Sequence, residues 1–207
     1  LYVHDTDSEG LYIGQTEDIA QNQHKFINLQ IYNNRIVRTG SEGIQVSHIA
    51  DGSRVYNNVV AMSAQSWKSP FQASQDFAIQ VVARYGQIEI DHNIVIGAAG
   101  NLFNARFVGT AAERNGPAGK LRVHDNYFSH SRSVFSYQIE QRGTNPLEGI
   151  NNDNKNSELW LENNYIQNVR FHHGEALIGA EDRHRLIDIN QNVVNPIVIK
   201  NNKFEPI

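Results

Sequence analysis

Residues 159–164 read Leu159-Trp160-Leu161-Glu162-Asn163-Asn164, in which apolar and polar side chains alternate before a pair of asparagines. Alternation with a period of two predicts a β-strand and not a helix. Variants of this phrase recur at intervals of about 24 to 38 residues, the size of one unit in a repeat architecture. The copies lie at 29–34, 53–58, 88–93, 121–126, 159–164 and 197–202, and the chain opens on a degenerate copy at 1–6.

The asparagines at the end of each copy predict a bend. Asparagine tolerates the left-handed backbone conformation better than most residues other than glycine. A bend at one fixed place per repeat, with a strand on either side, describes a coil, and stacked coils place equivalent strands in parallel about 4.8 Å apart. We therefore expect a ladder of side-chain amides along the stack, formed by Asn34, Asn58, Asn93, Asn126, Asn164 and Asn202.

Two further strands are expected in each coil. One lies at a variable distance after the bend, at 9–13, 42–46, 77–81, 103–107, 135–139 and 175–179. The other begins directly after the asparagines, at Ile36, Val59, Ile94, Tyr127 and Tyr165. The segment 187–194 also fits the opening phrase, and we interpret it as an extra strand in the last long loop. The inward residues expected to form the core include Ile31, Val55, Ile90, Val123, Leu161, Ile199, Ile44, Val46, Ile79 and Val81.

The phrase Gly43-Ile44-Gln45-Val46-Ser47, followed by Arg54-Val55-Tyr56-Asn57-Asn58, is typical of a known group of proteins. Over its whole length the chain resembles right-handed parallel β-helix repeat proteins of the pectate-lyase-like superfamily. The resemblance implies an all-β, single-stranded right-handed parallel β-helix of about seven coils, with three parallel sheets and an asparagine-rich turn. It also implies the sheet names: Gly-Ile-Gln-Val starts the first sheet, the strand ending at Asn-Asn is the second, and the next strand is the third. We expect one domain over 1–207, as a segment of a longer chain without its caps.

Composition limits the classes of function. The 207 residues carry 18 basic and 22 acidic side chains, a net charge of −4, so there is no general attraction to nucleic acid. No run of residues approaches the roughly 18 apolar positions of a membrane-spanning helix. Cysteine is absent, which excludes disulfides and thiolate chemistry. This composition is compatible with a secreted or bacterial cell-surface protein.

Alternation allows the outward side chains of the first sheet to be predicted. They are rich in amides and include one arginine, and such groups make directional hydrogen bonds to the hydroxyls and carboxylates of sugars. An ordinary solvated sheet face is an equally good interpretation. Long loops at 61–76, 108–119 and 140–157 are expected to wall a groove over this face. The candidate catalytic residues are Arg106 and Glu140, and the candidate substrate-binding residues are Gln45, Gln80, Asn104, Gln138 and Trp67.

The second sheet is expected to present two charged rows, Arg54–Glu89–Arg122 and Asp91–His124–Glu162. A histidine between two carboxylates could transfer protons. A ladder of opposite charges between strands is the favoured interpretation.

No metal site is assigned from the sequence. The dipeptide His172-His173 and the run Glu181-Asp182-Arg183-His184 lack the regular spacing of a three-ligand site. The superfamily's calcium sites use clustered acids on the first sheet. Here only Glu140, Glu175, Glu181 and Asp182 could cluster, so Ca²⁺ is a candidate cofactor without a clear site.

Three functional hypotheses remain. The resemblance implies an extracellular polysaccharide-active domain, either a lyase on uronate-containing glycans or, less favoured, a glycoside hydrolase. The clustered aspartates and the Gly-His-Gly of polygalacturonase-like enzymes are missing from the sequence. The alternatives are a non-catalytic glycan-binding module and a structural segment of a large surface protein or adhesin. The expected partner is a polysaccharide, with further domains of the same chain as a second expectation.

Overall fold

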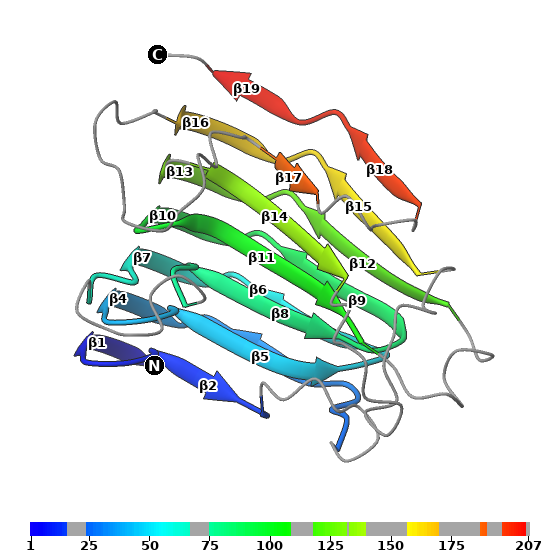
Figure 1. Ribbon diagram of the computed structural model, residues 1–207, viewed down its shortest axis with the longest axis horizontal. Helices are drawn as coiled ribbons and strands as arrows, with labels where there is room; N and C mark the ends of the chain where they lie inside the picture. The colour runs from blue at the N-terminus through cyan, green and yellow to red at the C-terminus, as the bar shows by residue number, and fades with distance from the viewer. Residues whose placement is uncertain are drawn as a thin grey trace, which may run out of the picture.

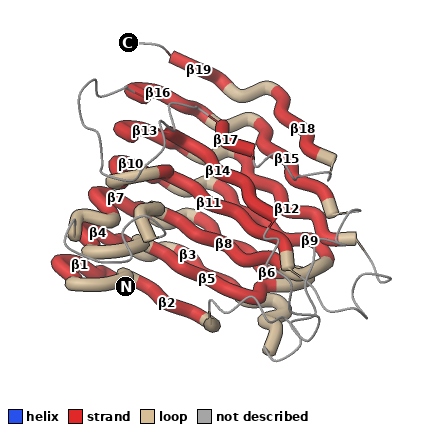
Figure 2. Tube along the Cα trace, viewed as in Figure 1, coloured by secondary structure: helices blue, strands red, loops and turns tan. Residues whose placement is uncertain are grey.

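The computed structural model describes residues 1–15, 24–66, 75–108, 118–131, 133–139, 157–169, 187–189 and 196–205. These residues form strands, turns and irregular segments, and there is no helix among them (Figure 2). The strands build three parallel sheets that run side by side along the length of the molecule (Figure 1). The all-β solenoid with three parallel sheets that the sequence predicts is therefore confirmed.

The first sheet has the strand order β17-β14-β11-β8-β5-β2. Its strands are β2 (Leu11–Ile13), β5 (Ile44–Ile49), β8 (Ile79–Ala83), β11 (Asn101–Phe107), β14 (Ser133–Ile139) and β17 (Ile187–Ile189). The second sheet has the order β18-β15-β12-β9-β6-β3. Its strands are β3 (Gln30–Tyr32), β6 (Ser53–Tyr56), β9 (Gly86–Asp91), β12 (Gly119–His124), β15 (Glu158–Glu162) and β18 (Ile197–Lys200).

The third sheet has the order β1-β4-β7-β10-β13-β16-β19. Its strands are β1 (Tyr2–Thr6), β4 (Arg35–Thr39), β7 (Val59–Ser63), β10 (Ile94–Ala98), β13 (Tyr127–Ser131), β16 (Tyr165–Val169) and β19 (Lys203–Glu205). The chain passes from the third sheet to the first and then to the second before it rises to the next turn. Its two ends consequently lie at opposite ends of the stack (Figure 1).

Two strand assignments from the sequence are wrong. The opening copy at 1–6 was expected in the second sheet, but β1 pairs with β4 in the third, where Tyr2 lies opposite Arg35. The segment at Ile187 was expected to be an extra strand, but β17 pairs with β14 and completes the first sheet. Both segments alternate as a strand should, and alternation alone does not say which sheet a strand joins. The expected first-sheet strand at 175–179 lies outside the described residues.

The number of turns is also lower than predicted. Two of the three sheets contain six strands and one contains seven, so the described strands make fewer complete turns than the seven expected.

The asparagine ladder is confirmed. Every ladder amide except that of Asn202 donates from Nδ2 to Oδ1 of the asparagine in the next turn, for example from Asn93 to Asn126 at 3.0 Å and from Asn126 to Asn164 at 3.0 Å. The same Nδ2 of Asn126 donates to the backbone oxygen of Ile90 in the preceding turn at 2.9 Å. The residue before each ladder asparagine has a positive φ, as at Asp125 (54°). The buried amides therefore offset the backbone cost of the bend by joining three successive turns.

The core lies between the three sheets and is filled by the predicted inward positions. Ile90 and Val123 are fully buried, as are their counterparts in the first sheet, Ile79 and Val81. Ile199 is the exception, with 49% of its surface exposed. It belongs to β18, which is the edge strand of the second sheet and has no described strand above it.

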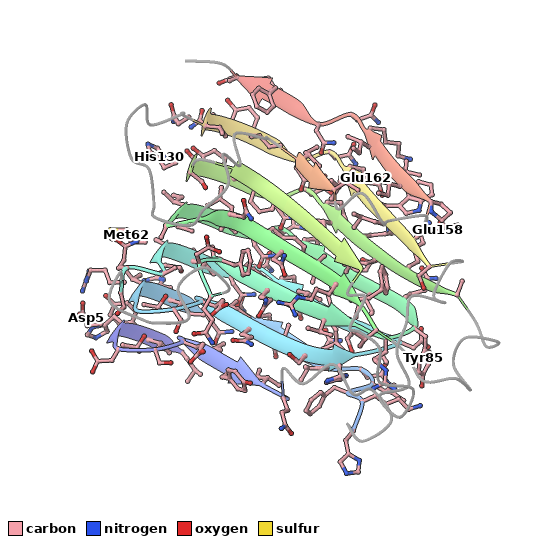
Figure 3. All side chains as sticks on the ribbon, in the orientation of Figure 1. Asp5, Met62, Tyr85, His130, Glu158 and Glu162 are labelled. Carbon is pink, nitrogen blue, oxygen red and sulfur yellow. The ribbon has the colours of Figure 1, made fainter. Side chains whose placement is uncertain are left out.

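A second column of left-handed residues lies within the strands of the third sheet, one residue before the strand end. It includes Asp5, Arg38, Met62 and His130, each with a φ between 53° and 60°. Asp5, Met62 and His130 lie along one edge of the stack (Figure 3). Arg38 Nε donates to Asp5 Oδ1 at 2.5 Å across neighbouring turns.

We searched the described residues for a helix long and apolar enough to span a membrane and found none.

Candidate functional site

The outer face of the first sheet carries the predicted row of amides. Gln45 of β5, Gln80 of β8 and Asn104 of β11 occupy equivalent positions on neighbouring strands. Gln80 Nε2 donates to Asn104 Oδ1 at 3.3 Å. Phe103 and Ala105 point into the core on either side of Asn104. The predicted inward and outward directions of this strand are therefore correct.

The predicted exposure of these amides is wrong. The exposed fractions of Gln45, Gln80 and Asn104 are 1%, 1% and 0%. Alternation determines to which side of a sheet a side chain points, but it does not determine whether solvent reaches that side. The expected loop walls fall largely at 67–74, 109–117 and 140–156, which lie outside the described residues.

Arg106 lies on the same outer face, two residues along β11 from Asn104, and is half-buried. In the backbone register it lies opposite Val82 of β8 and Gln138 of β14. The adjacency of Arg106 and Gln138 follows the prediction, although the structure does not describe the side chain of Gln138. Glu140 and Trp67 lie outside the described residues, and so do His172, His173, Glu175 and the run 181–184 considered for a metal.

Several polar atoms on and beside this face are buried without a hydrogen-bond partner. They include both carboxyl oxygens of Glu42, Oε1 of Gln45 and Oγ of Ser47. Buried polar atoms are normally satisfied by protein groups or by water, so such a group calls for an explanation. We call this set of atoms the unsatisfied strip. Its atoms need hydrogen-bond donors or acceptors that lie between the first sheet and the groups covering its outer face.

Glu42 is the most unusual member of the strip. It is fully buried and precedes Gly43, where an added Cβ would overlap Val60 of the third sheet. Burial, with a smaller contribution from the charges of Glu9 and Asp76, raises the pKa of the Glu42 carboxyl to about 8. The group is therefore mainly protonated at neutral pH. Sequence reasoning missed Glu42, although its repeated context, Glu9-Gly10 and Glu42-Gly43, was a usable signal.

The outer face of the second sheet carries a network of ion pairs. The register places Glu89 opposite Arg54 and Arg122, and Asp91 opposite His124, as predicted. The tightest contacts, however, are diagonal. Arg54 binds Asp91 with two hydrogen bonds, from Nε to Oδ1 at 2.7 Å and from Nη2 to Oδ2 at 2.5 Å. The favoured interpretation as a ladder of opposite charges is correct, but its pairs run obliquely across the strands.

The second diagonal pair repeats this arrangement two turns further along. Arg122 Nε donates to Glu162 Oε1 at 2.9 Å, and Lys200 Nζ lies 3.0 Å from Glu162 Oε2. Glu162 lies on β15, at the side of the molecule opposite the left-handed column (Figure 3). The hydrogen bond from Arg122 holds the pKa of Glu162 below its usual value, against an opposing effect of burial. Both arginines therefore act as fixed positive charges within this face.

Asp91 is fully buried on this face. Burial opposes its ionisation, but hydrogen bonds from Arg54 and His92 outweigh that effect and keep its pKa below the usual value. Its carboxylate is consequently charged at neutral pH despite being shielded from solvent.

His124 lies at the centre of the face and is nine-tenths buried. Its Nδ1 is 2.7 Å from Asp125 Oδ2, and its Nε2 is 3.4 Å from Glu89 Oε2. One ligand atom from each of Glu89, Asp91 and His124 lies within 4.8 Å of the others. The sequence predicted Asp91 and Glu162 as the neighbours of His124 and missed Glu89 and Asp125, although the dipeptide His124-Asp125 was visible.

Aromatic rings flank these charges. Tyr32 and Tyr56 stack with centroids 5.0 Å apart, and the guanidinium of Arg54 lies 4.2 Å from the ring of Tyr56. Lys120 and Lys200 lie over Trp160 at 3.8 and 4.6 Å. These ring faces are therefore occupied by neighbouring side chains of the same sheet.

Comparison of the chain with protein-family models, with curated proteins and with solved structures finds no match, so the assignment of a function depends on the geometry described above.

Proposed function

We propose that this chain is a polysaccharide-active β-helix domain of the pectate-lyase-like kind, which binds a uronate-containing glycan over the outer face of its first sheet. The observation that carries the proposal is the unsatisfied strip. Glu42, Gln45 and Ser47 are buried, yet both carboxyl oxygens of Glu42, Oε1 of Gln45 and Oγ of Ser47 lack protein partners. A bound glycan would supply hydroxyl groups that both donate and accept hydrogen bonds, which suits amide, hydroxyl and carboxyl groups alike.

The spacing of the row supports a polymeric ligand. Gln45, Gln80 and Asn104 repeat once per strand along the stack, at the interval of about 4.8 Å that separates neighbouring strands. These side chains are buried in the structure, so a glycan would have to take the place of what covers them. A row of equivalent groups at a constant interval would then offer equivalent hydrogen bonds to the successive units of a chain molecule. A small ligand would use only one or two of these positions.

Arg106 would recognise the acidic sugar. A guanidinium keeps its charge at any working pH and presents a planar fork that matches a carboxylate. If the domain is a lyase, Arg106 would neutralise the uronate carboxylate, and a second group would accept the C5 proton. Removal of the C5 proton would then form the C4–C5 double bond as the C4–O bond breaks. Glu140 and Gln138 would orient the sugar in this scheme.

The test combines binding and turnover on a panel of polyuronates. Binding is measured by calorimetry, and turnover by the absorbance of the unsaturated product. We expect Arg106→Ala and Gln80→Ala to weaken binding at least tenfold. Arg35→Ala, which removes an exposed arginine from the third sheet, should have no effect. Thermal melting of each variant checks that the fold survives.

The outcomes separate the hypotheses. Binding with turnover supports a lyase, and binding without turnover supports a glycan-binding module. Absence of binding across acidic and neutral glycans would overturn the proposal.

A structural role in a cell-surface protein is the second candidate. It is favoured by the second sheet, whose outer face is filled by ion pairs and by aromatic rings that stack on one another or on lysines. Such a face stabilises a long solenoid without needing a ligand. This candidate predicts that neither the Arg106 nor the Gln80 variant changes any glycan affinity.

A further inference from the structure

The second sheet carries a different feature, which does not depend on the proposed function. Glu89 and Asp91 of β9 and His124 of β12 converge on the outer face of this sheet, with ligand atoms within 4.8 Å of one another. Strand pairing fixes this arrangement, because His124 lies directly opposite Asp91 and Glu89 precedes Asp91 by two residues. All three side chains therefore project from the same side of two adjacent strands.

The hydrogen-bonding pattern of His124 leaves one ring nitrogen available to a cation. A carboxylate only accepts hydrogen bonds, so the nitrogen that faces Asp125 Oδ2 at 2.7 Å must carry a proton. A neutral imidazole has a single N–H, which leaves Nε2 with a lone pair. That lone pair faces Glu89 Oε2, another acceptor, at 3.4 Å. The His124 side chain is nine-tenths buried and that of Glu89 is 34% exposed, so a cation could reach this pair of acceptors from the Glu89 side and bind both.

The charges around the site leave room for a cation. Arg54 pairs with Asp91, Arg122 with Glu89 and Glu162, and Lys200 with Glu162. With Asp125 included, four carboxylates face three permanently charged cations, and one negative charge remains uncompensated. A carboxylate oxygen has two lone pairs, so Glu89 and Asp91 can keep their arginine partners while binding a metal ion through the remaining positions.

We propose that Glu89, Asp91 and His124 bind a divalent transition metal ion of the zinc class, with Asp125 as the residue that positions the imidazole. A mixed set of one imidazole nitrogen and two carboxylate oxygens suits zinc and similar ions, whereas calcium prefers oxygen ligands alone. Metal-binding histidines usually donate their other ring N–H to a carboxylate, which fixes the tautomer and the orientation of the ring. Asp125 occupies that position for His124.

The chain supplies a matched control. His4 and Asp5 reproduce the local pair, since His4 Nδ1 lies 2.7 Å from Asp5 Oδ2. The pair belongs to the third sheet, and neither residue is among the described groups whose ligand atoms converge. A histidine next to an aspartate is therefore present in both places, and only the His124 site adds two further carboxylates.

The experiment is a titration of chelator-treated protein with Zn²⁺, Co²⁺ and Ca²⁺ at pH 7.5, followed by calorimetry and, for Co²⁺, by visible absorption. We expect one saturable site for Zn²⁺ and Co²⁺ and none for Ca²⁺ at this position. Glu89→Gln and His124→Asn should abolish binding, Asp125→Asn should weaken it about 10–100-fold, and His4→Asn should leave it unchanged. Glu89→Gln is isosteric, so it tests the site even if the histidine variant does not fold.

Two results would overturn the proposal. One is the absence of saturable Zn²⁺ binding, or binding that persists in Glu89→Gln. The other is a nuclear magnetic resonance spectrum that shows both ring nitrogens of His124 protonated at pH 7.5 and unaffected by Zn²⁺, because a second proton would then supply the missing charge.

Discussion

The buried carboxyl of Glu42 makes a prediction about stability that can be worked out from the structure. Its exposed fraction is 0%, and its two oxygens have no hydrogen-bond partner. Burial raises its pKa from 4.5 to about 8 in the folded protein. In the unfolded chain the same group has its ordinary value, so it releases its proton at a lower pH than the folded protein does.

The sign of the effect follows from these two values. Between pH 4.5 and 8 the folded state holds a proton that the unfolded state has released, so the free energy of unfolding falls as the pH rises. Each pH unit in this window costs about 1.4 kcal/mol, and the full interval costs about 5 kcal/mol. Above pH 8 the contribution of Glu42 is constant, because both states are ionised.

Glu42→Gln replaces the acid by a neutral group of the same shape. We expect the variant to match the wild type within about 1 kcal/mol at pH 5, where the acid is also neutral. At pH 9 the variant should be more stable by several kcal/mol. Urea unfolding followed by circular dichroism at pH 5, 7 and 9 measures the difference.

Glu9→Gln provides a graded comparison. The charge of Glu9 raises the pKa of Glu42, so its removal should reduce the loss of stability at high pH without abolishing it. Parallel loss of stability between pH 5 and 9 in the wild type and in Glu42→Gln would refute the reasoning, because the pH dependence would then come from other groups.

Three further predictions concern the ladder, the core and the charged face. Asn126→Leu should destabilise the protein by about 1–3 kcal/mol in urea unfolding, since it leaves the polar groups of two neighbouring turns unpaired. Val123→Ala should cost about 1–3 kcal/mol through the cavity it creates, with no change in fold by circular dichroism. The pKa of Glu162 is lowered by Arg122, so this pair stabilises the protein above pH 4.5 and the contribution is lost as the pH falls. Arg122→Ala should flatten the stability profile at acid pH, and an unchanged profile would show that the pair contributes nothing.

The fold could be predicted from the sequence because one short repeated phrase specifies the strand, the bend that follows it and the contacts between turns. Alternation places Ile90 and Val123 in the core, and the asparagine that follows each strand both permits the bend and connects the turns. A residue such as Asn126 is thus specified locally by its backbone conformation and globally by its partners Asn93 and Asn164. Agreement of local and global preferences makes such a prediction secure.

Two edge strands, β1 and β17, were harder to predict for a related reason. β1 and β17 have the alternation of any strand, but their sheet is decided by pairing with distant strands. Tyr2 of β1 lies opposite Arg35 of β4, more than 30 residues away in the sequence. The residues within a strand do not indicate with which distant strand it will pair.

The candidate site on the first sheet was only partly predictable. The positions of Gln45, Gln80 and Asn104 on one outer face follow from the period of two, and the structure reproduces them. Their burial does not follow from it, because exposure depends on segments remote in sequence. The unusual acid Glu42 was missed because it lies just outside β5, beside the closely packed Gly43, and alternation does not predict its environment.

On the charged face of the second sheet, the strand register does not predict which side chains form the tightest ion pairs. Arg54 lies opposite Glu89, and a ladder read from the register alone would pair them. Side chains in a strand lean along the strand direction, and the long arginine reaches Asp91 two residues further on. The oblique pair leaves Glu89 with a single contact from Arg122 at 3.2 Å and allows its second oxygen to face His124. If Arg54 bound Glu89 instead, the buried charge of Asp91 would lose its main partner and His124 would face a neutralised carboxylate. Arg54 pairs with Asp91, two residues beyond the Glu89 that lies opposite it. This oblique pair therefore both stabilises Asp91 and leaves the set of acceptors on which the proposed metal site depends.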